Sequence, residues 1–222
     1  MTTLLAIGGW NDGEANLTDP TKYSRMANNP VLRRKFVESA LTMIRKWDFD
    51  GLDFDWEYPG SRGGDRSVDK ANFITLLTEL RTAFDPYGLL LTVAVSAGKQ
   101  TIDLAYDVPK MMPLVDYISI MGYDYHGGSW EDYLGHNAPL YSRPDETGLN
   151  AIFNVNYSVH YWLELGAPKD KIVLGMPLYG RTYTLLDSTK VNIGDKVKGA
   201  GPKYPISNEA GIVGYIEVCL NI

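Results

Sequence analysis

Three carboxylates at alternate positions form the strongest chemical signal in the sequence. Asp53, Asp55 and Glu57 lie within the run 49–57, where apolar and acidic residues alternate as in a β-strand with one buried face. Successive side chains of a strand point to opposite faces, so the three carboxylates share one face. The apolar residues that alternate with them share the other face. The pattern predicts a row of acids that is held in place by a buried apolar surface.

The close spacing of these acids determines what chemistry they could do. Like charges at this separation cannot all be ionised, so the row should hold at least one proton at neutral pH, with a raised pKa for some of its members. A carboxyl group that keeps its proton near neutrality is suited to general acid catalysis. We predict that Glu57, the last of the row, protonates a leaving oxygen, and that Asp55 passes a proton or a hydrogen bond toward it.

Two other interpretations of the row are possible. An acidic edge strand facing water would not need the large apolar residues Phe54 and Trp56 between the acids. Three carboxylates could also hold Mg²⁺ or Ca²⁺, but steps of two residues along one strand rarely surround an ion, and the sequence has no regular ligand spacing elsewhere. We therefore expect a site without metal or cofactor.

The row lacks an evident partner carboxylate. A glycosidase normally pairs its acid with a carboxylate from across the cleft, which would come from another strand. Asp124, at the end of the predicted strand 116–124, is the only carboxylate in a comparable position. One acid without a nucleophile is compatible with a mechanism in which the N-acetyl group of the substrate attacks the anomeric carbon, with an Asp and a Tyr to orient it.

The remaining sequence supplies the elements that must position these residues. Asn29 and Pro30 open a helix, as N-cap and first helical residue, and Asp85 to Gly88 end another as a turn. Strands alternate with helices, which indicates a parallel sheet, either doubly wound or closed as a (β/α) barrel. In a barrel the acids would converge on the C-terminal mouth, where active sites are built. The predicted strands are 3–10, 49–57, 89–96, 116–124 and 171–179, and the predicted helices are 30–47, 68–84, 107–112 and 155–165.

The last 40 or so residues break this alternation. The segments 182–186, 191–197 and 213–219 resemble antiparallel strands of a separate unit. We predict a partial barrel domain over 1–183 and the beginning of an α+β domain over 184–222.

Composition limits the partners of the protein. With 45% hydrophobic residues, 222 residues can bury a sizeable core. A formal charge of −6 without a basic stripe argues against nucleic acid, and no apolar run is long enough to cross a membrane. We expect a monomer that binds a neutral or small substrate. The first residues lack the features of a signal peptide, and Cys219, the single cysteine, is either a buried apolar residue or a half-cystine with a partner outside this chain.

The motifs together resemble the family-18 glycoside hydrolases, the chitinases of animals and microbes. Asp50, Asp53, Asp55 and Glu57 match the DxxDxDxE signature of that family. Four further segments resemble its other motifs in the same order, and these are 6–11, 121–124, 136–141 and 175–181.

The resemblance implies a fold and a set of roles. The fold would be part of a TIM (β/α)8 barrel, about strands 3 to 7, with the start of the α+β insertion domain. Glu57 would be the proton donor, Asp55 would orient the N-acetyl group and stabilise the oxazolinium intermediate, Asp53 would support Asp55 by sharing a proton, and Tyr123 would bind the N-acetyl carbonyl. The other residues implied to line the substrate site are Gly8, Gly9, Trp10, Asn11, Tyr58, Met121, Asp124, Tyr179 and Arg181.

The implied activity is retaining, substrate-assisted hydrolysis of β-1,4 bonds between N-acetylglucosamine units of chitin and chitooligosaccharides, by an extracellular enzyme. Two departures from the family pattern bear on this. Gly122 replaces the usual Thr, Ser or Ala, and an additional glycine in 125–130 would displace Trp130, a stacking residue of the animal members. The chain also resembles only an internal fragment of the catalytic domain. The alternatives are a chitinase-like lectin that binds chitooligosaccharides without cleaving them, and an inactive truncated fragment.

Overall fold

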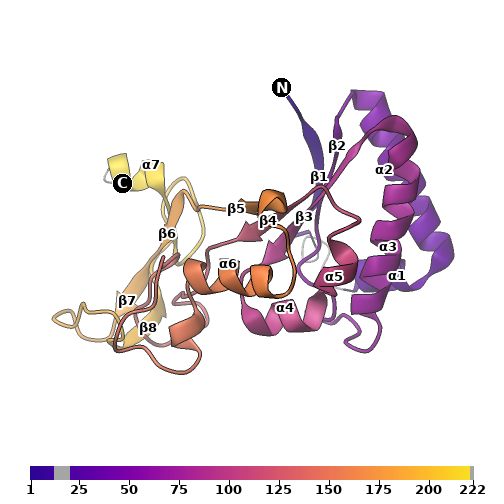
Figure 1. Ribbon diagram of the computed structural model, residues 1–222. Coiled ribbons are helices and arrows are strands. Elements are labelled where there is room, and N and C mark those ends of the chain that lie inside the picture. The colour runs from indigo at the N-terminus through magenta and orange to yellow at the C-terminus, as the bar shows by residue number, and fades with distance from the viewer. Residues whose placement is uncertain (13–20, 221–222) are drawn as a thin grey trace. The chain divides into compact units, whose positions relative to one another are not determined.

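The computed structural model describes residues 1–12 and 21–220, which form two compact units (Figure 1). The first unit comprises residues 1–121 and 160–174, and the second comprises residues 122–159 and 175–222. The domain boundary predicted between residues 183 and 184 stays a prediction.

The first unit contains the parallel sheet that the alternation of strands and helices predicts. Its strands are hydrogen-bonded in chain order, β1-β2-β3-β4-β5, and each neighbouring pair is parallel. Their carboxyl ends therefore meet at one edge of the sheet. The strands are β1 (Leu4–Gly8), β2 (Gly51–Asp55), β3 (Leu90–Ser96), β4 (Tyr117–Met121) and β5 (Ile172–Leu174).

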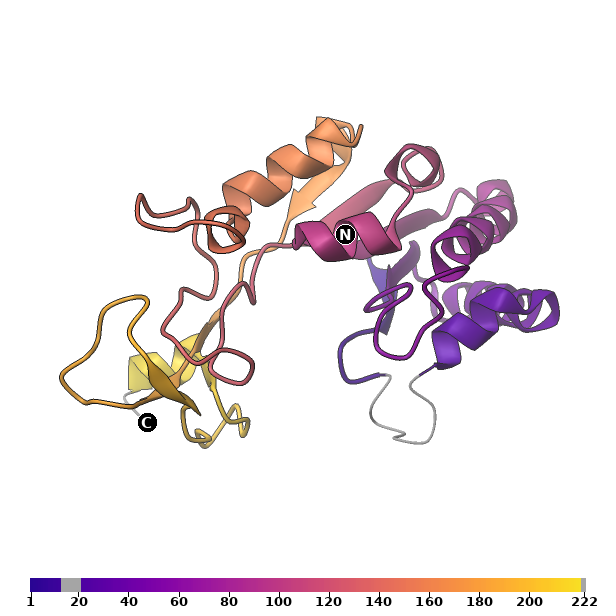
Figure 2. The ribbon, with the colours of Figure 1, turned by 90° about the horizontal axis from the view of Figure 1, so that it is seen from below.

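Helices connect these strands. The two views show α1, α2 and α3 side by side, next to β1, β2 and β3 (Figures 1 and 2). The sequence predicts α2, α3, α5 and α6, whereas α1 and α4 are short and were not predicted. The helices are α1 (Lys22–Asn28), α2 (Pro30–Trp47), α3 (Asp69–Phe84), α4 (Lys99–Ala105), α5 (Val108–Met111) and α6 (Val155–Glu164), with short 3₁₀ turns at Asp85–Tyr87, Asn150–Ile152 and Lys169–Lys171.

The start of α2 follows from two residues. The Asn29 side chain accepts hydrogen bonds from the main-chain N–H groups of Val31 and Leu32, at 2.9 and 3.2 Å. These are donors that a helix leaves without an internal partner, and Pro30 has no N–H that would need one. The predicted cap is confirmed.

The core of the first unit is aromatic beside β2. Phe54 and Phe73 are fully or almost fully buried, and their ring centroids lie 6.2 Å apart. Trp56 meets the edge of the Phe73 ring at 5.8 Å. This packing fixes the apolar face of β2 and therefore the direction in which its other face points. The predicted inward residues of α3 are all buried, and these are Phe73, Leu76, Leu77, Leu80 and Phe84.

The second unit contains two antiparallel strand pairs. Strand β6 (Tyr179–Arg181) pairs with β9 (Ile212–Gly214), and β7 (Tyr183–Leu185) pairs with β8 (Val197–Ala200). A short helix, α7 (Tyr215–Leu220), follows β9.

Several predicted strands have other boundaries. The strand predicted over 171–179 ends at Leu174, and β6 of the second unit begins at Tyr179. Pro177 lies between them and has no N–H for a strand ladder. The strands predicted over 49–57 and 116–124 end at Asp55 and Met121.

The end of the chain is helical where a strand was predicted. The strand predicted over 191–197 lies instead at β8, and the one predicted over 213–219 is only three residues long before α7 begins. Glu217 explains the change, because its carboxylate accepts from the Gly214 N–H at 2.9 Å, as the third residue of a helix does in a capping box. Cys219 on α7 is exposed and unbonded, so the interpretation as a buried residue is wrong.

Candidate active site

The acidic row lies where β2 reaches the carboxyl edge of the sheet. Asp53 and Asp55 belong to β2, and Glu57 follows two residues after the strand rather than ending it as predicted. The strand ends at Asp55 because its pairing with β1 stops there, at Gly8 opposite Asp55. All three acids are half-buried while the apolar residues between them are buried, so the predicted division into two faces is confirmed.

Asp53 is held by a neutral group on the neighbouring strand. Thr92 lies opposite it in the β2–β3 register and donates its hydroxyl to Asp53 Oδ1 at 2.5 Å. A hydroxyl donor fixes the orientation of the carboxylate without neutralising its charge. Asp53 is therefore held in a fixed orientation two residues before Asp55.

Asp55 has the environment of a carboxyl group that keeps its proton. Burial raises its pKa first, and the charges of Glu57 and Asp53 raise it further, to about 7. Its buried Oδ1 has no hydrogen-bond partner among the described residues. A neutral carboxyl group at this position could donate a hydrogen bond to a ligand.

Two glycines allow the end of β1 to approach Asp55 closely. Gly8 has φ of +112°, and a Cβ built on it would lie 1.9 Å from the Asp55 carbonyl oxygen. Gly9 donates its N–H to the same oxygen at 2.9 Å. Because these residues have no side chain, their backbone can lie directly against the backbone of Asp55.

Trp10 follows the two glycines with its ring half exposed. The Arg62 guanidinium carbon lies 3.7 Å from the Trp10 ring centroid, and Arg62 Nη1 donates to the Trp10 carbonyl at 2.7 Å. Asn11 is exposed in the turn that follows, and Met121 ends β4 half-buried. Arg62 was not predicted as part of the site, because the sequence gives no sign that residues 52 positions apart are in contact.

Two tyrosines lie close to Glu57. Burial raises the pKa of the Tyr58 hydroxyl, and the neighbouring Glu57, to which it hydrogen-bonds, raises it further. Burial likewise raises the pKa of Tyr106, whose hydroxyl accepts from the Ser96 N–H at 3.3 Å. Both hydroxyls therefore stay neutral donors near the acids. Tyr106 was not predicted.

The second unit brings together four other predicted residues. Arg181 donates to Asp124 Oδ1 from Nη2 and Nε, at 2.6 and 2.8 Å. Burial raises the pKa of Tyr179, and its hydrogen bond to Asp124 raises it further. The rings of Tyr179 and Tyr123 meet edge to face at 6.0 Å.

Asn137 joins two segments of this cluster of residues. It was predicted only as part of the segment 136–141. Its side chain accepts from the Asp124 N–H and donates to the Tyr179 carbonyl, both at 3.0 Å. An amide has both a donor and an acceptor, so it can fix two segments at once.

Trp130 belongs to the same cluster. The Arg181 guanidinium lies over its ring, 4.8 Å from the centroid. A Cβ on Gly127 would lie 2.4 Å from the nearest ring carbon of Trp130. The glycine therefore leaves room for the ring, and the displacement predicted for Trp130 stays a prediction.

The predicted site residues thus form two groups, each described within its own unit. Gly8, Gly9, Trp10, Asn11, Asp53, Asp55, Glu57, Tyr58 and Met121 belong to the first unit, and Tyr123, Asp124, Tyr179 and Arg181 belong to the second. Their roles toward a substrate stay predictions.

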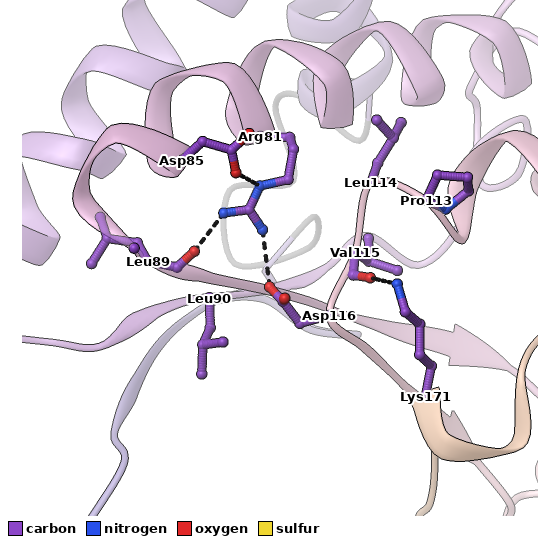
Figure 3. Close-up of a pocket in the computed structure, with 10 residues that line it drawn as sticks. Arg81, Asp85, Leu89, Leu90, Pro113, Leu114, Val115, Asp116 and Lys171 are labelled. Atoms are coloured by element: carbon purple, nitrogen blue, oxygen red, sulfur yellow. Dashed lines mark hydrogen bonds and ion pairs between the residues drawn. The ribbon is translucent and has the colours of Figure 1, made fainter.

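A cavity of about 400 Å³ lies at the opposite edge of the sheet, at the amino ends of β3 to β5 (Figure 3). Arg81 donates to Asp116 Oδ2 at 2.9 Å and to the Leu89 carbonyl at 2.6 Å. Lys171 donates to the carbonyls of Met112 and Val115 at 2.8 and 2.7 Å. These cations are already engaged by protein groups, and this edge of a parallel barrel usually contributes to stability.

Residues 1–12 and 21–220 contain no group of three or more His, Cys, Asp and Glu side chains that could hold a metal ion. No helix within 1–12 and 21–220 has the length and apolar character to cross a bilayer.

Comparison with known proteins assigns the family. The whole chain, residues 1–222, matches glycosyl hydrolases family 18. It is 47% identical over 215 residues to probable chitinase 2 of Drosophila melanogaster, covering 97% of this chain and 41% of that protein.

Solved structures give the same assignment. The group IV chitinase of Ostrinia furnacalis aligns with a TM-score of 0.92 and 44% identity, over 100% of this chain and 58% of that one. Human YKL-39, described as a pseudo-chitinase with retained chitooligosaccharide binding, aligns with a TM-score of 0.88 and 34% identity, over 100% and 59%. The chain spans about half the length of these relatives, and its five parallel strands correspond to part of a TIM barrel. The protein therefore belongs to glycosyl hydrolases family 18.

Proposed function

We propose that the protein is a chitinase that cleaves β-1,4 bonds between N-acetylglucosamine units with retention of configuration. The observation that supports this best is the environment of Asp55. Its pKa is raised to about 7 and its Oδ1 has no partner among the described residues, two residues from Glu57 at the carboxyl edge of the sheet. A neutral carboxyl group next to a second acid is what a substrate-assisted mechanism needs.

The proposed reaction has two steps. Glu57 gives its proton to the leaving glycosidic oxygen while the N-acetyl carbonyl oxygen of the substrate bonds to the anomeric carbon, which forms an oxazolinium ion. Asp55 accepts a hydrogen bond from the acetamido N–H and, as its proton shifts toward Asp53, stabilises the positive charge as a carboxylate. Glu57 next removes a proton from a water molecule that opens the oxazolinium ring from the face the leaving group vacated. Two inversions give net retention.

The remaining residues would bind and orient the sugar. Asp53, fixed by Thr92, would support Asp55 by sharing a proton. Tyr123 would donate to the N-acetyl carbonyl. Aromatic rings stack on sugar faces while polar groups bind hydroxyl and acetamido groups. The proposed lining comprises Gly8, Gly9, Trp10, Asn11, Tyr58, Met121, Asp124, Tyr179 and Arg181.

A lectin that binds chitooligosaccharides without cleaving them is the second candidate. The likeness to human YKL-39 favours it. The presence of Glu57 together with Asp53 and Asp55 favours catalysis, because each proposed proton transfer has its group. We further propose an extracellular monomer without a metal, and that the 222-residue chain alone is inactive because its five strands do not close a barrel.

Hydrolysis of a fluorogenic chitobioside separates these candidates. The assay should use both the 222-residue chain and the full-length protein, each as wild type and as Glu57→Gln, with and without EDTA. The proposal predicts release of the fluorophore by the full-length wild type, unchanged by EDTA, and a loss of at least a hundredfold in Glu57→Gln. Equal rates in the two forms would refute the assignment of the acid, and binding without hydrolysis by the wild type would establish the lectin.

A further inference from the structure

Asp69 is a buried carboxyl group that the proposed reaction does not use. It is the first residue of α3 and is fully buried. Ser24 donates its hydroxyl to Asp69 Oδ1 at 2.7 Å, and the Gly60 N–H donates to Oδ2 at 3.0 Å. Within the described residues no lysine or arginine forms an ion pair with it. A carboxyl group that is buried without a cation is costly, so its hydrogen bonds must compensate.

These hydrogen bonds do not serve the helix on which Asp69 lies. An acidic residue in the first turn is favoured by the helix dipole, but α3 has Val68 as its N-cap and no side-chain cap. Both oxygens of Asp69 instead contact other segments, which are α1 through Ser24 and the loop 58–64 through Gly60. Asp69 therefore connects separate parts of the first unit.

The loop 58–64 is folded directly onto this carboxyl group. The N–H of Ser61 donates to the Tyr58 carbonyl and that of Gly64 to the Ser61 carbonyl, both at 2.9 Å. A Cβ on Gly64 would lie 2.5 Å from Asp69 Oδ2, so the loop backbone is packed directly against the Asp69 carboxyl group. Ser24 Oγ also accepts from the Asp65 N–H at 3.3 Å, just beyond the loop.

The same loop reaches two residues of the proposed site. Its first residue, Tyr58, follows Glu57 and hydrogen-bonds it. Near its other end, Arg62 lies 3.7 Å from the Trp10 ring centroid and donates to the Trp10 carbonyl at 2.7 Å. Gly60, which Asp69 holds, lies between these two contacts.

We propose that Asp69 is a positioning residue that fixes the loop 58–64, and through it the orientation of both Glu57 and Trp10. The carboxyl group acts on the loop backbone and not on a substrate. The kinetic part of this proposal rests on the proposed function, whereas the part that concerns Trp10 does not.

The structural test follows the indole N–H resonance of Trp10, assigned with Trp10→Phe, without any substrate. Arg62→Ala shows in which direction and how far this resonance shifts when the guanidinium no longer stacks on the Trp10 ring. Asp69→Ala should shift the resonance in the same direction, while Asp69→Asn should leave it near the wild-type position because an amide can still accept from Gly60 and donate to Ser24 Oγ. Leu80→Ala, a core truncation in the same helix, is the control for lost stability and should also leave it unchanged.

The kinetic test compares the same variants in the full-length protein at a temperature well below unfolding. We expect Asp69→Ala to lower kcat by ten- to a hundredfold, because small displacements of a catalytic group are costly, and to raise KM several-fold through Trp10. Asp69→Asn should recover most of both values, and Leu80→Ala should keep wild-type values. If Asp69→Ala does not fold, Ser24→Ala removes one of the two donors and should shift the Trp10 resonance in the same direction.

The outcomes separate the two proposals. A Trp10 resonance that stays in place in Asp69→Ala, or that moves as far in Leu80→Ala, would overturn the positioning role. A resonance that shifts as expected in a protein without hydrolytic activity would support the positioning role and count against the proposed function.

Discussion

The two edges of the parallel sheet use their acids in opposite ways. At the amino edge, Asp116 is paired with Arg81 at 2.9 Å and also accepts from the Leu91 N–H at 2.8 Å. At the carboxyl edge, Asp53 accepts from the neutral hydroxyl of Thr92, and Asp55 Oδ1 has no hydrogen-bond partner among the described residues. Acids that are satisfied within the protein stabilise the fold, and acids that are not remain available to a ligand.

The signature motif itself is divided between these edges. Asp50 lies just before β2, at the amino edge, where its carboxylate accepts from the Thr3 N–H at 2.5 Å and from the Thr3 hydroxyl at 3.3 Å. Its main-chain groups bond to Thr3 and to Leu90, which ties the starts of β1, β2 and β3 together. The first aspartate of the motif therefore has a structural contact, while Asp53, Asp55 and Glu57 lie toward the other edge.

The largest effect is expected from the acid at the carboxyl edge. Glu57→Gln should lower kcat in the full-length protein by 10²- to 10⁴-fold, the usual contribution of a general acid, because glutamine cannot supply a proton. The unfolding midpoint should stay close to that of the wild type, since the change conserves size. If Glu57→Gln lowered the unfolding midpoint as well as kcat, Glu57 would have a structural role and the loss of activity would not identify it as the acid.

The next effect concerns the backbone that brings β1 against Asp55. Gly8→Ala should destabilise the protein by roughly 4 kcal/mol, because its Cβ would clash with the Asp55 carbonyl at 1.9 Å in addition to the unfavourable φ of +112°. Gly88→Ala is the matched control, since Gly88 has φ of +62° and nothing within 4 Å of an added Cβ, so only about 1 kcal/mol is expected. Urea unfolding measures both, and similar losses would mean that the close approach is not essential.

At the amino edge we expect a smaller loss of stability and no change in kcat. Arg81→Ala should cost about 2 kcal/mol of unfolding free energy, because it removes the cation that pairs with Asp116 and the donor to the Leu89 carbonyl. Lys110→Ala breaks the exposed pair with Asp107 and should cost less than about 0.5 kcal/mol. Below the unfolding temperature kcat should not change in either variant, and a large drop in Arg81→Ala would contradict the division between the two edges.

The smallest effect is a pH dependence that arises from Asp55. Its folded pKa of about 7 is raised above the value of about 4 for an unfolded aspartate, so folding favours the protonated form. Its contribution to stability is complete below about pH 4 and is lost as the pH rises through 7. Relative to Asp55→Asn, the wild type should lose roughly 1 to 2 kcal/mol of unfolding free energy between pH 5 and pH 8, allowing for solvent screening. Parallel curves for the two proteins would contradict a raised pKa.

Local patterns predicted much of the fold and the acidic row. The alternation along β2 gave the two faces correctly, because one side is packed against Phe73 and its neighbours and a shift by one residue would bury the acids. The Asn29 cap was equally local. Contacts between distant segments were not visible, and the Arg62 contact with Trp10 is one of them. The end of β5 before Pro177 and the Glu217 cap of α7 depend on local signals that the strand predictions over 171–179 and 213–219 did not use. The burial of Asp69 also depends on packing among three segments, so no short motif could indicate it.

A carbon-detected NMR titration of the Asp55 carboxyl group measures the pKa of Asp55 itself and does not depend on activity. We expect a midpoint near pH 7 in the wild type, and a lower midpoint in Glu57→Gln, where the adjacent charge is removed. A midpoint near 4 in the wild type, unchanged in Glu57→Gln, would show that Asp55 is ionised at neutral pH. It would contradict the proposal that Asp55 holds a proton beside Glu57.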